Sequence, residues 1–274
     1  MAKVAIDAGH ASDTPGKRTP SGYREHWFNV MVANYIATGI RERGFQTLRI
    51  AWNDSNSKDD VDVSLENRQK QIKNANCDIS ISIHANASGD GKSYNSTQGV
   101  ETYIHSNPSA VGDSKRLADC VHSYVIQGTK QNNRGIKSNE FAMCNCKSMG
   151  VKAAILIEYA FMTNSYEESL IKLDSFCREC AEETIHGICD YFKVPYTQST
   201  NNKKLYRVQC GAFSQEENAQ KLQKQLSDKG FSTSIKQTNG LYKIQVGAFG
   251  NKANAESLVE TVKGHGIDAT IIYN

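Results

Sequence analysis

The sequence predicts two domains: an α/β domain built on a mostly parallel, mixed sheet flanked by helices, and a small α+β domain with a βαβ-βαβ pseudo-repeat. Three observations predict them. Apolar, strand-like runs alternate with helical patterns over residues 1–192, a polar linker without apolar periodicity follows at 193–205, and a motif recurs within residues 206–274. The 274 residues are 39% hydrophobic and 22% charged, which suits two folded cores and argues against a disordered chain.

The elements of the first domain follow from local periodicity. Residues 78–84 alternate apolar and polar side chains, which is typical of a strand with one buried face. Residues 153–158 are a continuous apolar run ending in a glutamate, which is typical of a strand buried on both faces. Residues 25–43 repeat apolar side chains at helical spacing before Gly44, a frequent stop signal. In chain order, the sequence predicts strands at 3–7, 45–52, 78–84, 99–105 and 153–158, and helices at 25–43, 64–74, 113–127 and 167–191.

Three residues of the kind that bind metals or transfer protons stand where predicted strands end: His10, His84 and Glu158. Ligands of open α/β sheets gather outside the carboxyl ends of the strands, so we expect these side chains to lie close together. Two histidines and one carboxylate form the protein ligand set of catalytic zinc sites that leave the fourth position to water. A second, unligated carboxylate would act as general base, and the strand ends alone leave open which carboxylate has which role.

Four blocks of sequence carry a resemblance to a known family. They are Asp7-Ala8-Gly9-His10, Gly22-Tyr23-Arg24-Glu25 opening a predicted helix, Ser82-Ile83-His84-Ala85-Asn86, and Ile157-Glu158-Tyr159-Ala160-Phe161 followed by Thr163-Asn164. In this order and spacing they resemble the zinc-dependent N-acetylmuramoyl-L-alanine amidases over residues 1–192. The resemblance implies a zinc amidase or carboxypeptidase-like fold and one Zn²⁺ bound by His10, Glu25 and His84, with Glu158 as the catalytic carboxylate. Ala8 departs from the family, which usually has proline there, and Ala11-Ser12 replace the usual glycines.

The resemblance also implies the reaction. Zinc-activated water would attack the amide that joins the lactyl group of N-acetylmuramic acid to L-alanine in peptidoglycan, and Glu158 would pass the proton to the departing amine. Asp7, Asn86 and Arg134 are candidates for contacting the substrate or supporting the metal ligands, with Asn86 and Arg134 expected in loops. Two alternatives stay open: a zinc peptidase that cuts another bond of the wall peptide, and a non-catalytic peptidoglycan-binding protein.

The second domain contains an internal repeat. Tyr206-Arg-Val-Gln-Cys-Gly-Ala-Phe213 recurs 36 residues later as Tyr242-Lys-Ile-Gln-Val-Gly-Ala-Phe249, and each copy predicts strand, turn, helix and strand. The paired motif resembles the SPOR domain, which implies binding to peptidoglycan. Strand alternation directs the tyrosines inward and leaves four polar side chains on the open face, to bind glycan or merely solvent: Arg207, Gln209, Lys243 and Gln245. RNA-binding sheets expose aromatic side chains on their central strands, so we expect no nucleic-acid partner.

The cysteines and the remaining histidines have ordinary explanations. Cys177 and Cys180 have the spacing of half a zinc site or a redox pair, but they lie on a predicted helix and no second pair follows. We therefore expect buried structural thiols. His26 follows Glu25 on its helix and is expected to point toward solvent or substrate, while His105 ends a strand and is the one rival for a metal ligand.

The N-terminus lacks the basic segment and apolar run of a signal peptide, and no apolar run approaches the ~20 residues that span a bilayer. We therefore expect synthesis in the cytoplasm and action on the cell wall after release, through a holin or at mother-cell lysis, as for a phage endolysin or a sporulation-type autolysin. A formal charge of +3 is too small to predict an acidic partner.

Overall fold

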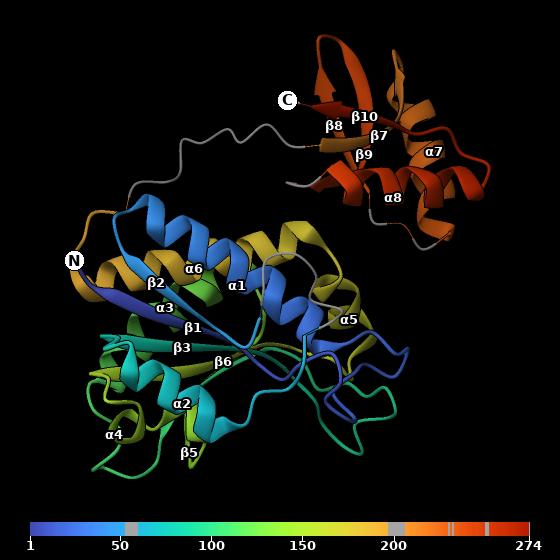
Figure 1. Ribbon diagram of the computed structural model, residues 1–274. Helices are drawn as coiled ribbons and strands as arrows, with labels where there is room; N and C mark the ends of the chain where they lie inside the picture. Colours follow the sequence, from blue (N-terminus) through green and yellow to red (C-terminus); the bar gives the residue numbers. More distant parts are fainter. Residues whose placement is uncertain (53–59, 197–205, 230, 232, 250–251, 274) are drawn as a thin grey trace. The chain divides into compact units, whose positions relative to one another are not determined.

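The computed structural model describes residues 1–52, 60–196, 206–229, 231, 233–249 and 252–273 (Figure 1). The chain divides into two compact units, which meet in the sequence between residues 198 and 199. Most of the predicted linker, residues 197–205, lies outside the described residues. The two units are described separately below. Within the described residues, no helix combines the length and the apolar composition that a membrane crossing requires.

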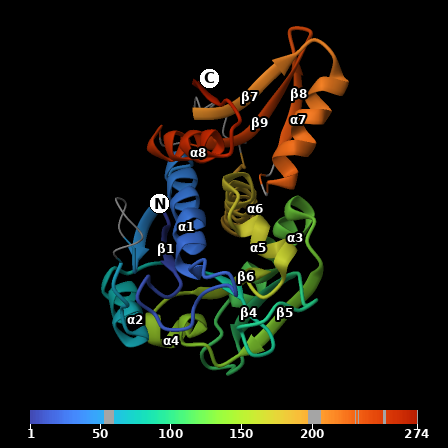
Figure 2. The same ribbon diagram turned by 90° about the vertical axis from the view of Figure 1, so that its right-hand side faces the viewer.

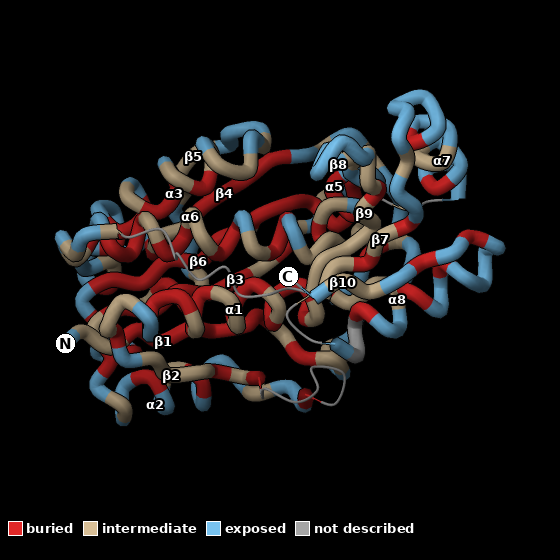
Figure 3. The backbone as a smooth tube through the Cα atoms, turned by 90° about the horizontal axis from the view of Figure 1, so that it is seen from above, coloured by how far each residue is buried: buried red, intermediate tan, exposed pale blue. Residues whose placement is uncertain are grey.

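The N-terminal unit is built on a six-stranded sheet with the order β2-β1-β3-β6-β4-β5. All neighbouring strands run parallel except β4 and β6, which are antiparallel, so the predicted mixed, mostly parallel sheet is confirmed. The central strands β1, β3 and β6 are almost entirely buried (Figure 3). The strands span Lys3–Ala8 (β1), Gln46–Ile50 (β2), Ile79–Asn86 (β3), Val100–His105 (β4), Asn133–Asn139 (β5) and Ala153–Phe161 (β6).

Helices cover both faces of this sheet, as the apolar character of its central strands requires. Figures 1 and 2 show α1, α3 and α6 on one face and α2 and α4 on the other. The helix α2 begins after Ser64, whose hydroxyl oxygen accepts from the backbone N–H of Asn67 and so caps the first turn. The helices span Glu25–Glu42 (α1), Leu65–Asn74 (α2), Ser114–Thr129 (α3), Cys146–Met149 (α4), Ser165–Ile171 (α5) and Asp174–Phe192 (α6), and a short 3-10 helix covers Ala142–Cys144.

Three local predictions are wrong, for the helix at 167–191, Arg134 and Asn86, and one strand was not predicted. The single helix predicted at 167–191 is two helices, because Glu167 ties α5 to the end of β6 by accepting from the backbone N–H of Phe161, while α6 packs across the sheet. The strand β5 was not predicted, because its residues are mostly polar and its pairing with β4, rather than an apolar pattern, holds it at the sheet edge. Arg134 therefore lies on a strand and not in a loop, and Asn86 is the last residue of β3.

The C-terminal unit is a four-stranded antiparallel sheet with the order β10-β7-β9-β8, which confirms the predicted α+β repeat. The helices α7 and α8 pack on one face, against a core that includes Val208, Cys210 and Ile244. Tyr206 and Tyr242 pack against the same core, as alternation predicts. The elements span Tyr206–Phe213 (β7), Glu216–Asp228 (α7), Ser234–Thr238 (β8), Leu241–Phe249 (β9), Lys252–Gly264 (α8) and Thr270–Tyr273 (β10).

Candidate metal centre

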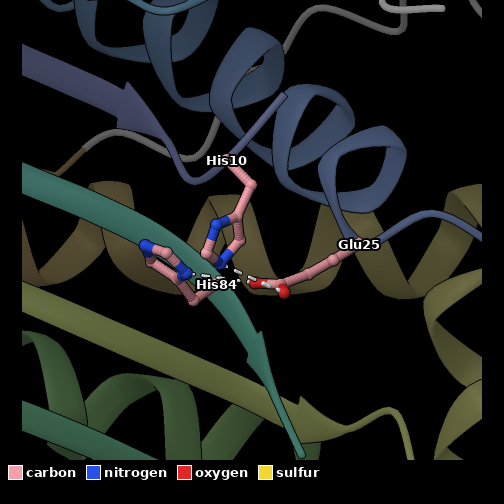
Figure 4. A group of neighbouring side chains, drawn as sticks. All are labelled: His10, Glu25 and His84. Atoms are coloured by element: carbon pink, nitrogen blue, oxygen red, sulfur yellow. Dashed lines mark hydrogen bonds and ion pairs between the residues drawn. The ribbon is translucent and has the colours of Figure 1, made fainter. Parts of the chain in front are cut away.

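Three side chains from separate elements converge on one point of the N-terminal unit (Figure 4). His10 comes from the loop after β1, Glu25 from the first turn of α1 and His84 from β3, and one nitrogen or oxygen from each lies within 4.8 Å of the others. Glu25 lies between the histidines: its Oε1 is 3.0 Å from Nδ1 of His84, and its Oε2 is 3.3 Å from Nε2 of His10. The sequence thus correctly identified three residues that the fold brings together.

The turn that carries His10 is shaped by Gly9. A Cβ at this position would lie 2.2 Å from Cε1 and 2.5 Å from Nε2 of His84, so only glycine leaves room for that imidazole. His10 itself has a φ of 61°, in the left-handed region that few residues other than glycine adopt. A left-handed backbone at such a residue persists only where surrounding contacts hold it. One of these contacts is made by the preceding residue, because the carbonyl oxygen of Gly9 accepts from Nδ2 of Asn29 at 3.1 Å.

Arg68 of α2 holds the same turn from the other side. Its buried guanidinium donates to the carbonyl oxygens of Ala8 at 2.9 Å and His10 at 2.8 Å, and it forms an ion pair with Asp7 at 2.8 Å. Asp7 also accepts from the hydroxyl of Ser82 at 2.5 Å. Asp7 therefore acts on the His10 loop through Arg68, and its contacts are with these supporting residues.

The prediction for His26 is wrong, because this side chain is fully buried and points toward neither solvent nor substrate. Its Nδ1 lies 2.9 Å from the carbonyl oxygen of Gly9, and its Nε2 lies 2.9 Å from Oδ2 of Asp60. Both neighbours are hydrogen-bond acceptors, so the ring donates to the turn that carries His10. No local pattern signalled this role, because it depends on the distant Asp60 and on the path of the loop.

The electrostatics of Glu25 and His10 suit metal binding, whereas at His84 the hydrogen bond and charge of Glu25 outweigh burial and raise the pKa of the imidazole. Burial by itself would raise the pKa of Glu25, but the two histidines and the N–H of Ala85 outweigh it and lower the pKa to about 2. Burial lowers the pKa of His10 to about 4, against the opposing charge of Glu25. At neutral pH the site therefore presents an ionised carboxylate beside a neutral imidazole, which are the protonation states that a metal ion binds.

Glu158 lies next to this cluster. It is the register partner of His84 in the parallel β3–β6 ladder, and both residues lie within their strands rather than at the ends, because the strands run further than predicted. Its Oε2 is buried and has no hydrogen-bond partner among the described residues. Burial, reinforced by the charges of Glu25 and Glu101, raises the pKa of Glu158 to about 8 despite the nearby His84. A buried carboxylate oxygen without a partner marks a place for a polar molecule.

Sequence reasoning missed Glu101 of β4, which faces Glu158 in the antiparallel β4–β6 ladder. Its buried carboxylate accepts from Nε of Arg134 and Nζ of Lys137, each at 2.5 Å, and from Nδ2 of Asn86 at 3.1 Å. The structure thus gathers Asn86 and Arg134, two of the predicted substrate-contacting residues, at one carboxylate beside Glu158. Only the burial of strand β4 could have signalled Glu101.

The other candidates lie outside this cluster. The rival ligand His105 is mostly buried, and its Nδ1 accepts from the backbone N–H of Asn107 at 3.0 Å. It is not part of the group formed by His10, Glu25 and His84. All eight cysteines are free thiols, and all but Cys120 are buried, which confirms the prediction for Cys177 and Cys180.

Comparisons with known proteins place the chain in a family. Residues 4–190 match the N-acetylmuramoyl-L-alanine amidase family and residues 202–273 match the SPOR domain. A sporulation-specific N-acetylmuramoyl-L-alanine amidase of Bacillus subtilis is 30% identical over 235 residues, covering 86% of this chain and 84% of the relative. The N-acetylmuramoyl-L-alanine amidase CwlM of Bacillus licheniformis is 29% identical, covering 86% of this chain and 85% of the relative.

Solved structures of amidases are also similar to the N-terminal unit of this chain. The N-acetylmuramoyl-L-alanine amidase of Clostridium difficile 630 superposes with a TM-score of 0.61 at 29% identity, over 70% of this chain and 97% of that one. The catalytic domain of the amidase CwlV from Bacillus (Paenibacillus) polymyxa var. colistinus gives a TM-score of 0.61 at 26% identity, over 71% of this chain and 100% of that one. The chain therefore belongs to the N-acetylmuramoyl-L-alanine amidases, a family of zinc-dependent peptidoglycan hydrolases, and joins its amidase domain to a peptidoglycan-binding SPOR domain.

Proposed function

We propose that His10, Glu25 and His84 hold Zn²⁺. We propose that Glu158 is the general base in hydrolysis of the amide between N-acetylmuramic acid and L-alanine. One observation carries this proposal: Oε2 of Glu158, buried and without a hydrogen-bond partner among the described residues, lies on the strand next to His84 of the three-residue metal-type cluster. The donor set fits the metal, since two imidazole nitrogens and one carboxylate suit Zn²⁺ and leave a position for water. Bound Zn²⁺ supplies Lewis-acid chemistry and lowers the pKa of that water to about 7.

The chain's own residues divide the remaining work. Glu25 is ionised and fixed by the N–H of Ala85 and by Asn29, so it keeps the ligand set in place. A cation held by the three neighbouring ligands would favour the ionised form of Glu158, which would then take a proton from the attacking water at Oε2 and return it to the nitrogen of the departing L-alanine. Arg68 and His26 hold the loop that presents His10, which keeps the metal ligands oriented.

We propose that the C-terminal unit binds glycan strands through the sheet face opposite its helices. The four residues of this face are half-buried on the central strands, and Nη1 of Arg207 donates to Oε1 of Gln245 at 3.2 Å. Such a flat array of cationic and amide donors suits hydroxyl, N-acetyl and carboxylate groups. Tethering to the wall raises the effective substrate concentration at the amidase domain. The proposed face comprises Arg207, Gln209, Lys243 and Gln245.

The bond specificity is tested by product analysis. The zinc-loaded full chain is incubated with purified peptidoglycan, and the products are identified by mass spectrometry. An amidase releases peptides with a free L-alanine amine and leaves the glycan strands intact. A zinc peptidase would leave L-alanine on N-acetylmuramic acid, and a non-catalytic binding protein would sediment with the wall without releasing products. Glu158→Gln serves as the control that should bind the wall and release nothing.

We further propose that the chain reaches the wall only after release from the cell that makes it. The similarity to a sporulation-specific amidase over 86% of this chain favours release at mother-cell lysis over release through a holin. Cell fractionation through sporulation tests this. The expected result is intact chain in the mother-cell cytoplasm before lysis and on the wall afterwards. Chain found on the wall of cells that are still growing would contradict the proposal.

A further inference from the structure

A row of ionisable side chains extends from the metal cluster across the sheet. His84 on β3 is paired with Glu158 on β6, and Glu158 is paired with Glu101 on β4. Register partners project from the same face of a sheet, so these three residues share the face that carries the metal cluster. The row continues to β5, where Arg134 and Lys137 both contact the carboxylate of Glu101.

We propose that Arg134 and Lys137 form a subsite for a carboxylate of the peptide that lies on the amine side of the scissile bond. This inference rests on the proposed function and names a further part of its substrate-binding site. The two cations are held in fixed positions by a buried group, because the side chain of Glu101, which contacts both, is only 3% exposed. Glu101 is further fixed by the hydroxyl of Tyr103, at 2.6 Å, and by Asn86.

The charge balance of the cluster leaves it ready for an anion. Among the described residues Glu101 is the carboxylate in direct contact with both cations, so within these contacts one positive charge is in excess, while Glu158 and Glu167 lie near without forming an ion pair with either cation. Glu101 is buried, whereas Arg134 and Lys137 are 36% and 38% exposed, so the excess charge lies on the accessible side. Arg134 contacts Glu101 through Nε, and among the described residues nothing accepts from its Nη groups. The guanidinium lies 5.0 Å from the ring centroid of Phe161, which holds its plane in place and leaves the Nη edge for a bidentate partner.

Chemistry decides which half of the substrate this subsite receives. The glycan half presents hydroxyl and N-acetyl groups, and its lactyl carboxyl is consumed in the scissile amide. Carboxylates therefore belong to the peptide half, which ends in one and carries others on acidic residues. Neighbouring strands lie ~4.8 Å apart, so β5 is about 14 Å from β3, a distance that an extended peptide covers in about four residues at ~3.3 Å each. A carboxylate within the first few residues beyond the scissile amide reaches the cation pair.

The test compares two peptides that differ only in charge. One is N-acetylmuramoyl-L-Ala-γ-D-Glu-L-Lys, and the other is the same compound with both carboxylates converted to primary amides. The zinc-loaded full chain should cleave the free acid with a higher kcat/KM than the amide. In Arg134→Gln and Lys137→Gln this preference should fall by roughly tenfold, as expected for loss of one hydrogen bond between charged groups. Lys115→Gln on α3, which removes the same charge away from the cluster, should leave the preference unchanged.

The preference is the ratio of kcat/KM for the free acid to kcat/KM for the amide. A variant that merely weakens folding or catalysis lowers both values and leaves their ratio unchanged. Calorimetry also measures the affinities of both peptides for the Glu158→Gln variant and for the Glu158→Gln/Arg134→Gln double variant. The ratio of the two affinities reports the same preference without turnover. Equal preference in wild type and both variants would overturn the subsite. A wild-type chain that cleaves neither peptide nor purified peptidoglycan would instead overturn the proposed function.

Discussion

His84 and Glu158 lie opposite each other on the parallel strands β3 and β6, so one hydrogen-bonded ladder positions both a metal-type ligand and a buried carboxylate. The neighbouring ladder adds Glu101 opposite Glu158. Because a sheet fixes which side chains share a face, the distance between the proposed ligand His84 and the proposed base Glu158 is set by backbone pairing and not by flexible loops. The two roles are nonetheless chemically separate, which makes them separable by substitution.

Substitution of the base and of a ligand should therefore have different effects. Glu158→Ala should bind one zinc per chain yet lose activity by about 10²–10⁴-fold, the usual contribution of general acid–base catalysis. His84→Ala should lose both zinc and activity. Zinc content by elemental analysis and release of L-alanine amine from purified wall measure these outcomes. His265→Ala, at an exposed position of the C-terminal unit, should change neither. Wall-lytic activity retained by purified Glu158→Ala would contradict the assignment of Glu158 as the general base.

Gly9→Ala should weaken the metal site without touching a ligand. Its Cβ would lie 2.2 Å from Cε1 of His84, so the imidazole must move. We expect zinc affinity and kcat/KM to fall by about 10–100-fold, as for other changes to groups that orient metal ligands. Competition with a chelator gives the affinity. Gly264→Ala, where a Cβ has no neighbour within 4 Å, is the matched control, and an unchanged zinc affinity in Gly9→Ala would show that the site is not shaped in this way.

Arg68→Met should destabilise the N-terminal unit by about 3–5 kcal/mol, because it leaves the carboxylate of Asp7 buried and unpaired. Urea unfolding followed by tryptophan fluorescence measures this unit alone, since the two tryptophans, Trp27 and Trp52, both belong to it. Adding Asp7→Asn should restore part of the loss. Lys115→Met removes an exposed i,i+4 ion pair and should cost less than about 1 kcal/mol. Equal losses in the two methionine variants would contradict the role given to Arg68.

Glu168 of α5 should make stability depend on pH in the acid range. Burial by itself would raise its pKa, but donors that include Thr19 and Lys172, each at 2.7 Å, and the hydroxyl of Tyr94 lower the pKa to about 2. A carboxyl whose pKa falls on folding contributes stability that is complete above its unfolded value of 4.5 and is lost as pH falls through about 2. The unfolding free energy of wild type relative to Glu168→Gln should therefore be constant above about pH 5 and decline toward pH 2.

Equilibrium urea titrations of both chains at several pH values provide the measurement. Wild type and Glu168→Gln lose their other acid-sensitive interactions equally. The difference between their free energies of unfolding therefore reports the contribution of Glu168 alone. A difference that stays constant from pH 5 to pH 2 would show that the hydrogen bonds to Glu168 do not favour its ionised form.

The sequence by itself determined the features that repeat or alternate locally. The alternation over 78–84 and the apolar run over 153–158 predicted β3 and β6, and the 36-residue repeat predicted the four-stranded unit. The strand ends predicted that His10 and His84 lie close together, the family resemblance added Glu25, and the fold brings all three side chains to one place.

Only the tertiary structure decided the features whose stability comes from distant partners. The polar strand β5 exists because it pairs with β4, and Glu101 is buried because Arg134 and Lys137, 33 and 36 residues away, neutralise it. His26 is buried because its two ring nitrogens meet Gly9 and Asp60, 17 and 34 residues away. A buried charge or imidazole is stable only when its hydrogen-bond partners are present, and no local pattern encodes partners that the fold supplies.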